Sequence, residues 1–363
     1  MAQIPFTRGV PSPDLLPVDD LRAAADKALA SEPALALSYL GGGGHPGLRS
    51  WIGARHGVPA ERVVASNGSL QAFLFVSELL VARASTPRVL VEAPTYDRPL
   101  ILLRRSGAEP VGIPVDEHGL DVDALEDDLR RAGAPAFLYV IPTFQNPSGS
   151  TLPLARRERL VELSHRFGFP IVEDDPYGLL RFRGDSLPTI HSLDPDRVIT
   201  MSSFTKTVAP GLRIGYAVAP ADLATRLTRH ATDTYIGPGA LAQSTLFAYT
   251  ESGRFEPNVE RAAAELGRRA GVMAAALREH FPAATTFVEP DGGYFLWVDL
   301  GRDGPDTTRL LAAATEAGVP YVKGADFYAA QGGEQAMRLA FSAVTPDEIG
   351  EGIRRLAAVV DAG

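Results

Sequence analysis

The amino-acid sequence predicts an α/β fold, with a mainly parallel, doubly wound sheet in a large domain and a second, smaller α+β domain. Three observations indicate this class. The chain has 363 residues, more than one small core requires. Short β-branched runs alternate with helical patterns over about residues 63–203, and strands separated in this way need crossover connections. After about residue 253 a long helical pattern leads into a second set of strands and helices.

The first predicted elements are helices. Residues 18–31, VDDLRAAADKALAS, begin with acidic residues and carry apolar positions at helical spacing. Four glycines at residues 41–44 predict a mobile or tightly turned loop. This loop leads into a second predicted helix, which carries Leu48, Trp51 and Ile52.

Polar residues follow the predicted strands of the central region. The strands are RVVAS, RVLVEAP, PVGIPVD, AFLYVIP, FPIVED and RVITMSS, with LDVDALEDDLRRA and ARRERLVELSHRFG among the helices between them. Ligands of a doubly wound sheet bind outside the carboxyl ends of its strands. Five strand ends therefore bring polar groups to one rim: Gly68 and Ser69, residues 94–96, Asn146, residues 174–177, and Ser203 with Lys206.

The change of pattern near residue 253 predicts the domain organisation. We expect an N-terminal segment, residues 1–38, that packs with the small domain. A large cofactor-binding domain is expected over residues 39–253, and a small C-terminal domain over residues 254–363. The small domain begins with the long helical pattern VERAAAELGRRAGVMAAALREHF and ends with PDEIGEGIRRLAAVV.

Composition excludes several classes of function. The net charge is −9 and basic residues are dispersed, which argues against binding to nucleic acid. The absence of cysteine excludes disulfides, thiolate metal sites and cysteine nucleophiles, and the seven histidines form no close pair at ligand spacing, so we expect no metal site. No membrane-spanning run and no secretory leader is visible, so the expected location is cytoplasmic.

Lys206 is the central candidate residue. It lies in MSSFTKTVAPGLRIGY, residues 201–216, and no other charged residue occurs within six positions of it. A lysine amine attacks an aldehyde only when it is deprotonated, which is rare at its reference pKa of about 10.4. Small hydroxyl-bearing and apolar neighbours can exclude water and lower that pKa. The pattern therefore favours an aldehyde-bearing cofactor such as pyridoxal phosphate.

That cofactor makes further demands, and the strand ends supply a candidate for each. Asp174 can pair with a protonated pyridine nitrogen, and Tyr177 and Asn146 can donate to the phenolic oxygen. Tyr96 can stack on the ring. A phosphate dianion suits the free N–H groups at a helix N-terminus, and hydroxyl and guanidinium donors can add to them. The candidates for the phosphate are Gly68, Ser69, Leu70, Ser203 and Arg213.

Four motifs in register carry a family resemblance. PTFQNPSG, VEDDPYG, SSFTKTVAPGLRIGY and MRLAFS occur in this order and spacing. The chain thereby resembles the fold type I, class I/II aminotransferases that depend on pyridoxal phosphate. It is most similar to the aminoadipate-type branch and to the aminotransferase-like domain of MocR regulators. The resemblance covers nearly the whole chain.

The resemblance implies roles at the matching positions. Lys206 is similar to the lysine that forms a Schiff base with the cofactor, and Asp174 to the pyridinium partner. Arg338 resembles the arginine that holds the substrate α-carboxylate, with Asn146 beside it. Tyr39 resembles a tyrosine that reaches the phosphate of the neighbouring subunit, so a homodimer is expected. The remaining implied cofactor contacts are Gly68, Ser69, Leu70, Tyr96, Tyr177, Ser203 and Arg213.

The sequence departs from the family pattern near the expected substrate entrance. Relatives in the aminoadipate branch carry an extra N-terminal helix over the substrate, and this chain begins about where that helix would end. Arg8 stands where glycine is common, and Lys323 is similarly unusual. A desolvated cation needs a partner, so an inward-facing Arg8 or Lys323 predicts a substrate with a polar or acidic side chain. Both residues are equally consistent with solvated charges at the rim.

The predicted function is an aminotransferase that moves an amino group between an α-amino acid and a 2-keto acid. One alternative is another pyridoxal-phosphate reaction, such as decarboxylation, elimination, cyclisation or oxidation, because the same lysine, aspartate and arginine serve all of them. A second is a ligand-sensing module of the kind found in regulators. We expect no such role, because no winged-helix domain precedes this region and the net charge is −9.

Overall fold

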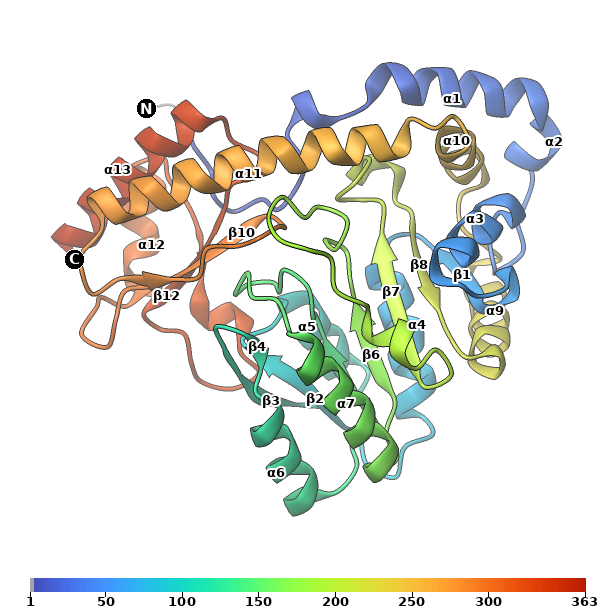
Figure 1. Ribbon diagram of the computed structural model, residues 1–363, viewed down its shortest axis with the longest axis horizontal. Coiled ribbons are helices and arrows are strands. Elements are labelled where there is room, and N and C mark those ends of the chain that lie inside the picture. Colours follow the sequence, from blue (N-terminus) through green and yellow to red (C-terminus); the bar gives the residue numbers. More distant parts are fainter. Residues whose placement is uncertain (1–2) are drawn as a thin grey trace.

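The structure is a computed structural model, and it describes residues 3–363. Its centre is an eight-stranded sheet of order β1-β8-β7-β6-β5-β2-β3-β4, in which β3, β2, β5, β6 and β7 run parallel to one another (Figure 1). Antiparallel pairing joins β8 to both β1 and β7, and β4 to β3. The strands are β1 (Val63–Ser66), β2 (Arg88–Ala93), β3 (Glu109–Asp116), β4 (Gly119–Leu120), β5 (Phe137–Val140), β6 (Ile171–Asp174), β7 (Val198–Ser203) and β8 (Gly215–Val218).

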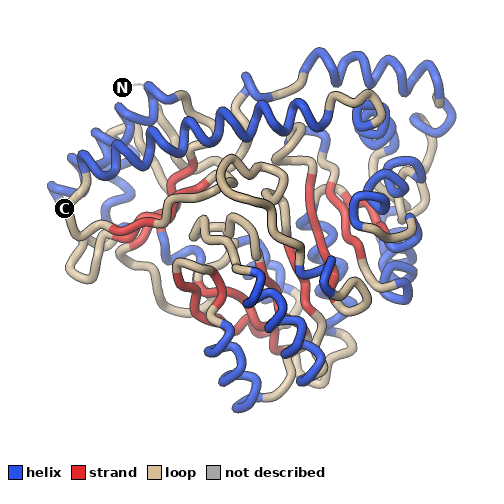
Figure 2. Tube along the Cα trace, viewed as in Figure 1, coloured by secondary structure: helices blue, strands red, loops and turns tan. Residues whose placement is uncertain are grey.

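Both faces of this sheet are buried, which explains the continuous apolar runs in its strands. On β5, Phe137 and Tyr139 belong to one apolar cluster, while Leu138 and Val140 belong to another on the opposite face. Helices cover both faces, as the tube in Figure 2 also shows. The predicted doubly wound sheet is thus confirmed. One set of helices is α4 (Ser69–Val81), α5 (Asp97–Arg105) and α9 (Ala221–Tyr235), and the other is α6 (Val122–Ala132), α7 (Leu154–Phe167) and α8 (Ile190–Leu193).

A smaller antiparallel sheet of order β11-β12-β10-β9 lies in the C-terminal part of the chain. The long helix α11 packs against α13 and continues toward α10 (Ala240–Thr250), so that it joins the two sheet regions along one side (Figure 1). The elements are α11 (Phe255–His280), β9 (Thr286–Phe287), β10 (Phe295–Asp299), α12 (Thr307–Glu316), β11 (Val322–Lys323), η4 (Gly324–Phe327), β12 (Ala336–Ala340) and α13 (Pro346–Ala362).

The N-terminal part of the chain contacts both regions. The predicted helix over residues 18–31 is confirmed with the same bounds, and it packs on α10. The backbone N–H groups of Ile4 and Phe6 donate to the carbonyls of Gly318 and Pro320. The first two residues of the predicted segment 1–38 lie outside the described residues, and the domain boundaries stay a prediction. The remaining elements are η1 (Pro13–Leu15), α1 (Val18–Ser31), α2 (Pro33–Ala36), α3 (Pro46–His56), η2 (Ala60–Arg62), η3 (Pro210–Leu212) and α10 (Ala240–Thr250).

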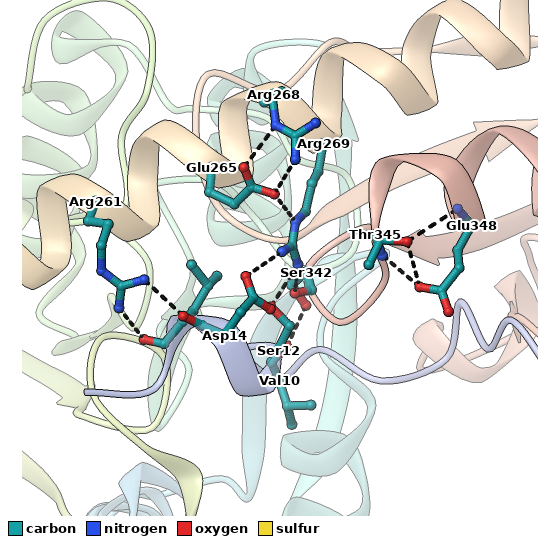
Figure 3. A network of polar contacts seen from close by, with 11 residues as sticks. Val10, Ser12, Asp14, Arg261, Glu265, Arg268, Arg269, Ser342, Thr345 and Glu348 are labelled. Carbon is teal, nitrogen blue, oxygen red and sulfur yellow. Dashed lines mark hydrogen bonds and ion pairs between the residues drawn. The ribbon is translucent and has the colours of Figure 1, made fainter. Parts of the chain in front are cut away.

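Arg269 of α11 ties this N-terminal segment to the small sheet region. Its side chain is only 2% exposed, and its guanidinium donates to Ser12 Oγ, Asp14 Oδ2, Glu265 Oε1 and the Ser342 carbonyl at 2.7–2.9 Å (Figure 3). A buried cation needs such a set of acceptors to offset its loss of hydration. One side chain therefore connects three segments that are far apart in the sequence.

Within residues 3–363, none of the helices combines the length and the apolar character needed to span a bilayer.

Replacing this buried arginine should destabilise the fold. We expect Arg269→Met to lower the free energy of unfolding by roughly 2–4 kcal/mol, because Asp14 and the Ser342 carbonyl lose their charged donor. Urea unfolding followed by circular dichroism measures the change. Arg268→Met is the matched control, since Arg268 also pairs with Glu265 but is 57% exposed, and we expect little change in the free energy of unfolding. Equal losses of unfolding free energy in the two variants would contradict the stabilising role of the buried Arg269.

Candidate active site

A cavity of about 450 Å³ lies at the carboxyl ends of the parallel strands and is closed on its other side by the small sheet region. All of the predicted site residues except Arg8 and Tyr39 line it. These are Gly68, Ser69, Leu70, Tyr96, Asn146, Asp174, Tyr177, Ser203, Lys206, Arg213 and Arg338. The others lining it are Thr7, Gly9, Asp97, Arg98, Ile141, Pro176, Thr205, Phe295, Val322 and Asp326.

The Lys206 amine projects into this cavity from the turn after β7. Its Nζ donates to the carbonyl of Gly9 at 2.5 Å and lies 5.7 Å and 5.5 Å from the ring centroids of Tyr177 and Tyr294. The Tyr294 hydroxyl donates to the backbone carbonyl of Lys206 at 2.7 Å and so holds its backbone. Burial, assisted by the Arg338 charge, lowers the pKa of Lys206 to about 8. The amine is therefore much more readily deprotonated than a lysine in water.

Asp174 ends β6 with its carboxylate buried at the floor of the cavity. Its Oδ2 accepts a hydrogen bond of 2.8 Å from the Tyr139 hydroxyl. Its Oδ1 is buried without a hydrogen-bond partner among the described residues. Burial raises the pKa of Asp174 to about 7. A buried acceptor without a donor is costly, so the protonated ring nitrogen of the predicted cofactor fits this oxygen.

The N-terminus of α4 and Arg213 form a site for an anion. Gly68 precedes the helix with φ 86°, and a Cβ at this position would lie 2.6 Å from Arg213 Nη2. Arg213 Nη2 donates to the carbonyl of Asn67 at 3.2 Å. The first N–H groups of α4 have no acceptors within the helix, and a guanidinium beside them adds positive charge. A phosphate therefore fits here, with Ser203 on the same cavity wall.

Arg338, on β12, occupies the opposite wall. Its Nη1 donates to Asn146 Oδ1 at 3.0 Å and its Nη2 to the carbonyl of Thr7 at 2.9 Å. The guanidinium carbon lies 4.1 Å from the centroid of the Phe295 ring, which supports it. Nε is buried with no partner among the described residues. A guanidinium held in this way retains N–H groups for a carboxylate.

The predicted donors to the phenolic oxygen and the predicted stacking ring also reach the cavity. Because Asn146 Oδ1 accepts from Arg338, its amide N–H groups are left to donate to a ligand. Tyr177 is buried and packs against Tyr294 with 5.5 Å between ring centroids. Tyr96 directly precedes α5 and lines the cavity, and burial raises its pKa to about 12.

The structure places the remaining predicted residues away from the cavity wall. Arg8 is exposed, although its neighbours Thr7 and Gly9 line the cavity. Tyr39 is 82% exposed on the surface of this chain. Lys323 forms an ion pair with Asp326 at 3.4 Å, and it is Asp326 that lines the cavity. The partner for Lys323 thus lies within the chain.

Sequence reasoning missed several residues at the site. Tyr139 is the one hydroxyl-bearing residue in the apolar run AFLYVIP. A polar group in an otherwise apolar strand is the signal that could have identified it. Gly9 was also missed, although a Cβ there would lie 2.3 Å from the Phe295 ring, so this position requires glycine. Tyr294, which holds the backbone of Lys206, carries no comparable local signal.

The described residues contain no group of three or more His, Cys, Asp or Glu side chains placed to hold a metal ion.

Comparison with known proteins identifies similar chains of nearly the same length. The chain is 34% identical over 355 residues to the 2-aminoadipate transaminase of Thermus thermophilus, a match that covers 97% of this chain and 88% of the relative. It is 33% identical over 368 residues to aromatic-amino-acid aminotransferase 1 of Thermococcus litoralis, covering 98% and 88%.

A solved structure agrees closely with the fold. The α-aminoadipate aminotransferase of Thermus thermophilus, complexed with N-(5'-phosphopyridoxyl)-L-leucine, superposes with a TM-score of 0.93 at 33% identity. The match covers 99% of this chain and 92% of that one. The predicted fold type I architecture, the aminotransferase activity and the pyridoxal phosphate cofactor are thereby confirmed. Residues 3–356 match the family model of aminotransferase class I and II, and the chain belongs to that family.

Proposed function

We propose that Lys206, Asp174 and Arg338 form the catalytic and substrate-binding centre of this aminotransferase. The observation that carries the proposal is that one cavity collects a buried amine, a carboxylate oxygen without a donor and a guanidinium with a free N–H group. These are the groups needed by an aldehyde, a protonated pyridine nitrogen and a substrate carboxylate. Pyridoxal phosphate, when bound, supplies the aldehyde that accepts an amine and the ring that disperses negative charge.

Several residues would hold that cofactor. Asp174 Oδ1 would accept from the ring nitrogen and keep it protonated. Asn146 and Tyr177 would donate to the phenolic oxygen, and Tyr96 would stack on the ring. The phosphate would rest at the N-terminus of α4, where the donors are the N–H groups of Ser69 and Leu70 next to Gly68, together with Ser203 and Arg213.

Lys206 then acts as a general base and acid. Once its amine is free, Nζ would take the proton from Cα of the bound amino acid and pass it to the cofactor carbon that carried the aldehyde. With a 2-keto acid, Nζ would move the proton in the reverse direction. A pKa near 8 suits both transfers, because protonated and neutral forms are both populated near neutral pH. Tyr177 and Tyr294 flank the amine and limit the access of water to it.

Arg338 would bind the α-carboxylate of the amino acid and of the 2-keto acid. Its guanidinium lies against Phe295 and is oriented by Asn146 and Thr7. Because both substrates share this carboxylate, one arginine serves both halves of the reaction. The same residues also allow other pyridoxal-phosphate reactions. These reactions release different products, so a product assay distinguishes them from transamination.

The side chain of the substrate would meet charged groups at the cavity mouth. Asp97, Arg98 and Asp326 line the cavity there, with Arg98 3.5 Å from Asp97 and Lys323 3.4 Å from Asp326. We propose that this mixed polar rim favours a polar side chain over a bulky apolar one. Arg8 is exposed and would act only if its side chain turned inward.

The proposed assembly is a homodimer in which Tyr39 reaches the phosphate of the partner's site. Leu37, Tyr39, Ile236 and Leu241 are large apolar side chains left exposed. They belong to adjoining segments, since a Cβ on Gly237 would lie 2.0 Å from the carbonyl of Leu40. Large apolar side chains left exposed on adjoining segments are typical of an interface. The domain division at residues 38 and 253 and a cytoplasmic location stay predictions.

Transamination is tested by a half-reaction. The purified protein with pyridoxal phosphate is mixed with an amino donor and no keto acid. We expect one equivalent of keto acid per site and recovery of the cofactor as its amine, with reversal on addition of a 2-keto acid. Lys206→Ala, although folded, should release none, because no base removes the Cα proton. Release of carbon dioxide, or of ammonia with no aminated cofactor, would instead establish one of the other reactions.

The role of Arg338 is tested by truncation. Arg338→Ala should raise KM for the amino donor by roughly 30- to 1000-fold, equivalent to about 2–4 kcal/mol of lost charged hydrogen bonding. Steady-state kinetics measures the effect, and Arg309→Ala, at a site exposed on α12, should leave KM unchanged. An unchanged KM in Arg338→Ala would remove this residue from the binding site.

The proposed interface is tested by introducing a negative charge at one of its exposed apolar positions. Leu37→Asp should shift the protein from dimer to monomer in sedimentation velocity and should lower activity in parallel, because a buried carboxylate in an apolar contact is costly. Val18→Asp, an exposed position at the start of α1, is the control and should remain dimeric. A monomer with full activity at working concentration would refute the shared site.

A further inference from the structure

We infer that Tyr139 is a positioning residue for the cofactor site: its hydroxyl holds one oxygen of the Asp174 carboxylate so that the other faces the ring nitrogen. The inference rests on the proposed role of Asp174 and deepens it. Among the described residues, Tyr139 provides the hydrogen bond to this carboxylate, at 2.8 Å, and Oδ1 is left without a partner.

The strand register brings the two groups together. Tyr139 on β5 pairs with Val172 on β6, and Asp174 follows two residues later along β6. Side chains two residues apart on a strand point to the same face of a sheet, so Asp174 and Tyr139 share one face. The Tyr139 ring is fully buried and packs against Phe73 with 5.0 Å between ring centroids, which leaves its hydroxyl little freedom.

The surroundings of Asp174 explain why a donor is needed. Its charged neighbours are the carboxyl of Asp175 and the amine of Lys206. Burial disfavours the negative charge on Asp174, and the neighbouring carboxyl of Asp175 disfavours it further. A hydroxyl that donates to Oδ2 stabilises the anion, and it does so without adding a competing positive charge next to Lys206.

The Tyr139 hydroxyl is suited to act only as a donor here. Burial and the neighbouring Asp174 charge raise the pKa of Tyr139 well above its usual value of 10, so it keeps its proton throughout the working range. With Oδ2 engaged by this donor, the carboxylate cannot rotate freely, and Oδ1 stays available to the cofactor. Phenylalanine would keep the ring and its packing while removing the donor.

The test is a double-mutant cycle on cofactor affinity. The apparent Kd of pyridoxal phosphate is measured for wild type, Tyr139→Phe, Asp174→Asn and the double variant. We expect Tyr139→Phe to weaken binding roughly tenfold to a hundredfold, as for loss of a hydrogen bond to a charged group. In the Asn background the same change should have little effect, because the carboxylate through which Tyr139 acts is gone. We also expect Tyr139→Phe to lower kcat while KM for the amino donor stays near wild type.

The control is Tyr249→Phe. Tyr249 lies on α10, outside the site, and its buried hydroxyl donates to the carbonyl of Arg254 at 3.2 Å. This substitution should leave cofactor affinity unchanged even if it lowers thermal stability. The inference is overturned if Tyr139→Phe binds the cofactor as tightly as wild type does. It is also overturned if the change weakens cofactor binding by the same factor in wild type and in Asp174→Asn. Failure of wild-type protein to bind pyridoxal phosphate would instead overturn the proposed function on which it rests.

Discussion

The parallel pairing of β2, β5, β6 and β7 is the constraint on which the site depends. Parallel strands end at one edge of the sheet, so the residues that follow them meet there even though they are far apart in the sequence. Asn146, Asp174 and Lys206 reach one cavity for this reason. Because helices cover both faces of the sheet, polar groups in these segments concentrate at its edge. The cavity is therefore a consequence of the topology.

Loss of hydration sets the chemistry of the groups gathered at that edge. The same cause acts in opposite directions on two of them, lowering the pKa of Lys206 to about 8 and raising that of Asp174 to about 7. Buried polar groups normally find partners inside the protein, but Asp174 Oδ1 and Arg338 Nε have none among the described residues. The site thus holds unmet hydrogen bonds that a ligand of matching chemistry would satisfy.

The N-terminal segment links the stability of the fold to the site. The carbonyls of Thr7 and Gly9 accept from Arg338 and Lys206, while Ser12 and Asp14 accept from Arg269 a few residues later (Figure 3). Anchoring by the buried Arg269 therefore fixes the course of the backbone that borders the two cationic groups of the cavity. Gly9 allows this backbone to pass next to the Phe295 ring.

Local patterns in the sequence determined much of this protein. Helical periodicity predicted α1 with its observed bounds, and alternating strands and helices predicted the doubly wound sheet. The motifs around Asn146, Asp174, Lys206 and Arg338 indicated the family, because each motif is a contiguous stretch of chain. The positions of Asn146, Asp174 and Lys206 at or after strand ends were enough to predict that they meet, whereas Arg338, which lies within β12, was assigned to the site through the family resemblance.

Tertiary structure decided what depends on register and on contacts between distant segments. The bond from Tyr139 to Asp174 requires the pairing of β5 with β6 in one register, and a shift by one residue would turn Tyr139 to the other face. The exposure of Arg8 and the passage of Gly9 beside Phe295 depend on how the N-terminal segment folds back on the small sheet region. Residue spacing carries no information on these contacts, because their partners lie in separate segments whose relative positions only the packed molecule establishes.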